Sequence, residues 1–106
     1  MNIDDKIREI AAHATTNGGY ERLCITIECP LSSGIRVYGT KVCHGKEERV
    51  ALTGGMRPFF LFAKEEKEKR TEPFNIVEIT VSANGRARYI YHFDQVLQHR
   101  AEEDVK

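Results

Sequence analysis

The side chains in this sequence that could perform catalytic or metal chemistry are four histidines and three cysteines. They are His13, His44, His92, His99, Cys24, Cys29 and Cys43. No two histidines stand at the spacing of zinc ligands with an acid between them, and HExxH is absent. Cys43 and His44 would need two more ligands to hold zinc, and none stands at a suitable spacing. We expect no metal and no cofactor.

Nucleophilic catalysis needs an activated side chain beside a base. Cys43 with a remote histidine could form such a pair, but the spacing in the sequence does not indicate which histidine that would be. An odd number of cysteines without a CxxC pair indicates free thiols, whose role the sequence leaves open. Gly54 and Gly55 are not followed by GK[ST], so they do not form a phosphate-binding loop. We expect a protein that is not an enzyme and has no catalytic residue.

The composition indicates a single globular domain, residues 1–106, with 41% apolar and 30% charged residues. Sixteen basic and sixteen acidic residues cancel, so no overall positive field attracts nucleic acid. The longest apolar run, Phe59 to Ala63, is far shorter than the ~20 residues that cross a bilayer. The N-terminal residues MNIDDKIREI have acids where a signal peptide has bases. We expect a cytoplasmic protein with no membrane partner.

Apolar periodicity predicts the elements of the first half. A helix over 2–16 has Asn2 as its cap and one apolar stripe, which comprises Ile3, Ile7, Ile10, Ala11 and Ala14. Period-two alternation then predicts strands at 20–29, 35–43 and 48–52, with turns at 31–34 and 44–47.

The second half begins with a helix over 57–70, because Pro58 suits a first helical turn. A hairpin follows from Phe74. Asp94 can then cap a last helix over 95–103, and Val96 and Leu97 would pack this helix against the rest of the fold. The tail, 101–106, is expected to fray.

The register of the final hairpin decides which of its side chains are buried. A two-residue turn at Asn84-Gly85 would mix apolar and polar residues on both faces. A three-residue loop, 83–85, with Gly85 left-handed, instead gathers the apolar residues on one face. These are Val77, Ile79, Val81, Ala87, Tyr89, Tyr91 and Phe93. Each buried member stabilises by roughly 1.5–3 kcal/mol, so the three-residue loop is favoured. The other face is then polar, with Glu78, Thr80, Arg86, Arg88, Ile90 and His92.

Together these elements predict the α+β class: a single, mostly antiparallel five-stranded sheet with helices packed on it. The predicted order is α-β-β-β-α-β-β-α.

Arg86, Arg88 and His92 alternate with Tyr89 and Tyr91, a pattern that could bind nucleic acid by stacking. The favoured register separates the tyrosines from the arginines on opposite faces, which argues against nucleic acid as the partner. A small nucleic-acid-binding or regulatory binding module remains the alternative function.

Acidic clusters offer a different surface. Each cluster could be ordinary solvated surface, or part of a patch that docks on a basic partner such as a nuclease with a lysine-lined cleft. The candidate partner-binding residues are Glu47, Glu48, Glu65, Glu66, Glu68 and Glu72.

The C-terminal third resembles a known family. Phe74, the strand to Ser82, Asn84-Gly85, Arg88-Tyr89 and the ending Tyr91-His92-Phe93-Asp94 resemble bacterial immunity proteins of polymorphic toxin systems. The likeness is greatest to the YezG-like group, which includes immunity proteins of contact-dependent growth inhibition. Phe74 stands where that group usually has tryptophan, and Asn84-Gly85 replaces Asp-Gly.

The resemblance implies an antitoxin that binds one cognate toxin domain, often a nuclease, and neutralises it by stoichiometric occlusion. It carries over no catalytic residue and no contact residue, because contacts differ from pair to pair. It is compatible with a monomer or a weak dimer.

Overall fold

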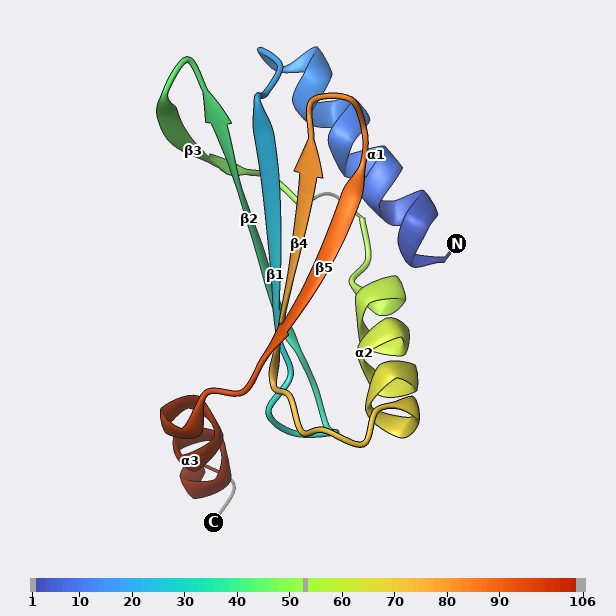
Figure 1. Cartoon of the computed structure of the whole chain (residues 1–106), viewed down its shortest axis with the longest axis vertical. Helices are drawn as coiled ribbons and strands as arrows, with labels where there is room; N and C mark the ends of the chain where they lie inside the picture. The colour runs from blue at the N-terminus through green and yellow to red at the C-terminus, as the bar shows by residue number, and fades with distance from the viewer. Residues whose placement is uncertain (1, 53, 105–106) are drawn as a thin grey trace.

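The computed structural model describes residues 2–52 and 54–104, which form a five-stranded sheet and three helices (Figure 1). The elements are α1 (Ile3–Thr16), β1 (Arg22–Glu28), β2 (Arg36–Cys43), β3 (Lys46–Val50), α2 (Arg57–Lys69), β4 (Ile76–Ser82), β5 (Ala87–His92) and α3 (Gln95–Asp104). The predicted α+β class, sheet size and element order are confirmed. Among the described residues, no helix combines the length and apolar character that a bilayer crossing requires.

The sheet has the strand order β3-β2-β1-β4-β5, and every neighbouring pair is antiparallel. At its centre, Leu23, Ile25 and Ile27 of β1 lie opposite Val81, Ile79 and Val77 of β4. All six side chains are at most 1% exposed. Helices α1 and α2 cover this one face, one beyond the other along the strands (Figure 1).

Helix α1 follows its predicted pattern. The Asn2 side chain accepts a hydrogen bond from the Asp5 N–H (2.9 Å), and Ile7, Ile10 and Ala14 are buried. At the other end, Lys41 of β2 donates from Nζ to the Asn17 carbonyl (2.6 Å). An ammonium at a helix C-terminus satisfies a carbonyl and opposes the helix dipole, so Lys41 fastens α1 to the sheet.

The final hairpin has the favoured register, with Val81 opposite Ala87, Ile79 opposite Tyr89 and Val77 opposite Tyr91. Gly85 has φ of 87°, the left-handed conformation that the three-residue loop requires. Asn84 Oδ1 accepts the Arg86 N–H (3.1 Å), which closes the loop. The predicted register is confirmed, and Tyr89 and Tyr91 are half-buried on the predicted face, but Ala87 on that face is exposed.

Phe93 does not continue the buried face, because β5 ends at His92 and Phe93 is 45% exposed. The chain turns there because Asn75 Oδ1 accepts the Asp94 N–H (2.8 Å), which redirects the backbone into α3. The prediction that Phe93 points inward is wrong.

The third strand is also displaced from its predicted range, since it spans 46–50 rather than 48–52. The turn before it has only two residues, His44 (φ 52°) and Gly45 (φ 74°), which lets Cys43 pair with Lys46 directly. Two left-handed residues make the tight turn whose twist matches that of the flanking strands.

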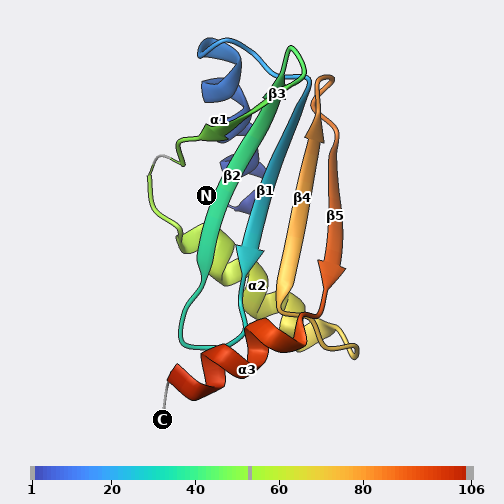
Figure 2. The ribbon, with the colours of Figure 1, turned by 90° about the vertical axis from the view of Figure 1, so that its left-hand side faces the viewer.

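Helix α3 lies at one end of the sheet, on the side opposite α1 and α2 (Figures 1 and 2). Asp94 caps it by accepting the Val96 and Leu97 N–H groups, as predicted. Val96 does not dock the helix, because it is 60% exposed. Residues 101–104 are helical, and residues 105–106 of the predicted tail lie outside the described residues.

Polar contacts from one buried side chain hold α3 in place. Asn75 is 0% exposed, and its Nδ2 donates to the Asp94 carbonyl (2.8 Å) and to Gln98 Oε1 (3.2 Å). Gln98 in turn donates to the Pro30 carbonyl (3.0 Å), which links α3 to the end of β1.

We expect Asn75→Ala to lower the free energy of unfolding by about 1–3 kcal/mol, because it removes the hydrogen bonds that the buried Asn75 side chain makes to the Asp94 backbone and to Gln98. Urea unfolding measures the loss, and amide hydrogen exchange should show faster exchange in α3 than in β1. Gln95→Ala, an exposed site on the same helix, is the control and should change stability little. Equal stability of the Asn75 and Gln95 variants would contradict this account of α3.

Candidate partner-binding surface

The sheet has one face that no helix of the described chain covers over its central area (Figure 2). Strand alternation assigns to this open face the even-numbered residues of β1, β2, β4 and β5, and Glu47 and Arg49 of β3. A sheet with one packed face and one solvated face alternates apolar and polar residues along its strands, and β1 and β4 show this pattern. The open face is therefore a largely polar sheet surface that α1 and α2 do not cover.

The basic side chains on the open face are arginines, apart from His92. They are Arg22, Arg36, Arg49, Arg86 and Arg88, with Arg86 assigned by alternation from Arg88. The lysines of the described strands, Lys41 and Lys46, lie on the opposite face. Arginine is enriched in protein interfaces, whereas lysine is depleted there.

Apolar side chains are exposed beside these arginines. Tyr38 is 42% exposed and Ile90 is 38% exposed, and both belong to the open face. Helix α3 lies at the lower end of the sheet, on the same side as this face (Figure 1). Exposed aromatic, aliphatic and arginine side chains on a rigid sheet are the groups that usually anchor a protein partner.

A small network fixes one corner of the open face. Tyr38 donates from its hydroxyl to Glu28 (3.3 Å), and Arg36 lies 4.0 Å from the same carboxylate. The Arg36 guanidinium also lies 5.7 Å from the centre of the Tyr38 ring. Partial burial, and then the Glu28 carboxylate, raise the pKa of Tyr38. At another corner, His92 lies 3.5 Å from Glu78.

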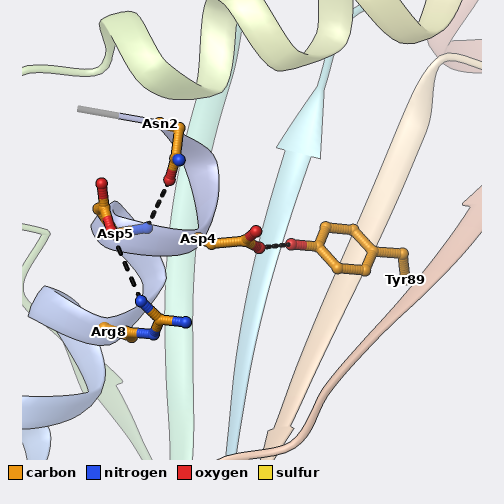
Figure 3. A network of polar contacts seen from close by, with 5 residues as sticks. All are labelled: Asn2, Asp4, Asp5, Arg8 and Tyr89. Atoms are coloured by element: carbon orange, nitrogen blue, oxygen red, sulfur yellow. Dashed lines mark hydrogen bonds and ion pairs between the residues drawn. The ribbon is translucent and has the colours of Figure 1, made fainter.

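The two tyrosines of β5 point away from the open face, toward the helices. Tyr89 donates to Asp4 of α1 (3.2 Å), next to the Asn2 cap and the Asp5–Arg8 pair (Figure 3). Tyr89 also packs on Phe62 of α2, with ring centres 5.4 Å apart.

Tyr91 makes the equivalent connection to α2. Its hydroxyl donates to Glu66 (2.6 Å), and the Arg70 guanidinium lies 3.7 Å from the centre of its ring. The two tyrosines therefore join β5 to both covering helices. Their predicted separation from Arg86 and Arg88, on opposite faces of the hairpin, is confirmed.

The six glutamates that the sequence singled out do not form one surface. Glu47 and Glu48 are exposed on opposite sides of β3, at one edge of the sheet. The others belong to α2 and the loop after it, in the helix layer (Figure 1). Glu66 is only partly exposed and is held by Tyr91, whereas Glu65, Glu68 and Glu72 are exposed.

The thiols are free and spread over the fold. Cys29 is buried, which raises the pKa of its thiol, and Cys24 on the open face has its pKa raised by burial and then by Glu78. Cys43 contacts the Gly18 carbonyl (3.5 Å). Within the described residues, no three His, Cys, Asp or Glu side chains are grouped so that they could hold a metal ion.

Comparison with protein-family models gave no match, and neither did comparison with curated proteins.

The tyrosine contacts predict a loss of stability at high pH. Burial, followed by Asp4 for Tyr89 and by Glu66 for Tyr91, raises the pKa of each phenol to about 12. An unfolded tyrosine ionises near pH ~10, so the folded state holds these protons more tightly. The free energy of unfolding should therefore be unaffected by these groups below pH ~10 and fall as the pH rises toward about 12.

Urea unfolding at a series of alkaline pH values measures this decrease. Tyr89→Phe and Tyr91→Phe should each make the decrease smaller, because phenylalanine has no proton to lose. Tyrosine absorbance would contradict the account if all four tyrosines ionised together near pH ~10 in the folded protein.

Proposed function

We propose that this chain is an immunity protein that works in the cytoplasm, where it binds one cognate toxin domain and neutralises it by stoichiometric occlusion. The observation that carries the proposal is the open face, a sheet surface with exposed arginines, Tyr38 and Ile90. The hairpin from Phe74 to Asp94 resembles immunity proteins, and this resemblance indicates a toxin domain as the partner. The described fold supports inhibition by direct contact with that partner.

The residues behind that likeness are structural. Phe74 is buried in the core, Asn84 closes the hairpin loop, and Asp94 caps α3. They support a shared architecture, so the toxin itself must be recognised by other side chains.

Two surfaces could contact the toxin, and they lie on different layers of the molecule. One is the open face, and the other is the exposed glutamates of α2, Glu65 and Glu68, with Glu72 beyond them. A globular partner that binds the open face lies on the side of the sheet opposite α2, so it does not contact both surfaces. One of the two surfaces must therefore carry most of the binding. We favour the open face, because buried arginine and aromatic contacts dominate interface energies whereas rim charges chiefly affect association rates.

Nucleic acid is the second candidate partner for the same arginines. Sequence-tolerant binding of single strands also needs aromatic rings on which bases stack. Tyr89 and Tyr91 turn their rings toward the helices, and Tyr38 is the aromatic side chain that the described strands leave on the open face. This composition fits a protein partner better.

The test is co-expression with the toxin domain that the proposal expects to be encoded beside this chain. The two proteins should co-purify in equal amounts, and Arg22→Glu combined with Arg88→Glu should weaken binding by about tenfold or more. Both arginines are exposed, so the variant should keep the stability of the wild type.

The matched control is Glu65→Lys with Glu68→Lys, which also reverses two exposed charges but on α2. This variant should leave the affinity for the toxin within about twofold of the wild type. The only change expected is in the association rate at low salt. Loss of binding in the α2 variant alone would assign the interface to the helix layer. Salt-sensitive binding of RNA without any toxin complex would favour the nucleic-acid alternative instead.

A further inference from the structure

An arginine cluster, formed by Arg22, Arg86 and Arg88, lies at the end of the open face where β1 begins and the β4–β5 loop lies (Figure 2). Arg22 lies opposite Ser82 of β4, and on the other side of β4 the Arg86 carbonyl accepts the Ser82 N–H (2.9 Å). Arg88 follows two residues along the same face of β5. Since adjacent strands are ~4.8 Å apart and alternate residues of one strand ~7 Å apart, the three Cα atoms lie within about 12 Å of one another.

No described residue forms an ion pair with the arginine cluster. All three side chains are exposed, and the ion pairs of the described chain involve other residues. Like charges at this separation repel one another, because the Debye length at physiological salt is ~8–10 Å. A bound anion removes that repulsion, so the cluster favours an anionic partner.

The other basic side chains of the open face each have an acid near them on that face. The pairs are Arg36 with Glu28, His92 with Glu78 and Arg49 with Glu47. The first two pairs approach to 4.0 Å and 3.5 Å, and the members of the third lie two residues apart on β3. Glu78 is also diagonal to Arg88 across β4 and β5, but its carboxylate contacts His92. The unbalanced positive charge of the open face is therefore concentrated in the arginine cluster.

Protection of a sheet edge does not account for this cluster. Charged side chains on an edge strand prevent pairing with the edge of another molecule, and this role suits Arg86 and Arg88 of β5. Arg22 belongs to β1, the central strand of the sheet, where no edge needs protection. Recognition of an anion gives all three arginines the same role.

Carboxylates fit the cluster better than the phosphates of a nucleic acid. Binding of single strands also needs aromatic rings on which bases stack. Tyr38, which is exposed on the open face, lies on β2, three strand positions away from β5, and Tyr89 turns toward α1. Ile90, two residues from Arg88 on the same face, is exposed and offers an apolar contact to a protein segment instead.

We propose that the arginine cluster binds an acidic segment of the toxin, whose Asp or Glu carboxylates are held by the three guanidinium groups. A guanidinium donates two parallel hydrogen bonds to one carboxylate, which gives the contact direction as well as charge. This inference rests on the proposed function and names the chemistry of the toxin surface that the open face recognises. A cleft lined with lysines is repelled by the cluster, so the cluster contacts a different part of the toxin.

The first experiment titrates the ¹⁵N-labelled chain with two blocked peptides, Gly-Glu-Asp-Glu-Asp-Gly and its counterpart with lysine at every acidic position. The acidic peptide should shift the amide signals of 21–24, 80–82 and 86–89, and the basic peptide should not. Equal shifts with both peptides, no shift with either, or shifts centred elsewhere would overturn the proposal. Inorganic phosphate is the third probe, and binding tighter than that of the acidic peptide would assign the cluster to phosphate groups and overturn it too.

The second experiment removes charge from the cluster. Arg22→Gln with Arg86→Gln should weaken binding of the acidic peptide by about five- to tenfold. The matched control, Arg57→Gln with Arg100→Gln, changes the net charge equally at exposed positions of α2 and α3 and should leave binding within about twofold. Equal weakening in both double variants would show a general charge effect and refute the cluster. If the first variant fails to fold, Arg88→Gln alone serves instead, and unchanged binding in that variant would count against the proposal.

The toxin separates this inference from the proposed function. Arg86→Lys introduces an amine into the cluster, and a carbodiimide joins an amine to a neighbouring carboxylate as an amide while the reagent takes up the water lost. Mass spectrometry of the complex should find position 86 linked to a toxin Asp or Glu, and Arg57→Lys, the control, should give no link at position 57. A complex that forms without a link at position 86 refutes the acidic contact and leaves the immunity function standing. A toxin that forms no complex refutes the immunity function, and the peptide titration still decides whether the cluster binds carboxylates.

Discussion

The structure depends on one constraint: the two central strands bury three large apolar side chains each on the same face. Leu23, Ile25 and Ile27 meet Val77, Ile79 and Val81 there, and α1 and α2 exclude water from them. Burial of this kind is the main stabilising contribution in a domain of this size. Because both long helices are used to cover that face, the other face is left for contact with solvent or a partner.

Polar contacts then determine where the helices lie. Tyr89 reaches α1 through Asp4, Tyr91 reaches α2 through Glu66, and Lys41 holds the C-terminal end of α1. These contacts add little net energy each, but they restrict the orientation of the helices on the sheet. A surface whose backbone is held in this way loses little freedom when it binds, which favours tight association.

Part of the candidate surface could be predicted from the amino-acid sequence, and part could not. The glutamate clusters were visible as runs of charge, but adjacent residues of a strand point to opposite faces, so Glu47 and Glu48 separate. The arginines of the open face come from four strands that are distant in sequence. Local periodicity assigned Arg86 and Arg88 to a polar face, yet gave no sign that Arg22, Arg36 and Arg49 share it.

The amino-acid sequence by itself determined the caps of α1 and α3, the class of the fold and the register of the final hairpin. Each depends on residues that are close in the chain, where turn geometry and side-chain alternation limit the choices. Only the tertiary structure decided that β1 lies between β2 and β4, that α3 stands on the opposite side from α1 and α2, and that Lys41 is buried. Those outcomes depend on contacts between distant segments, whose relative free energies no local pattern contains.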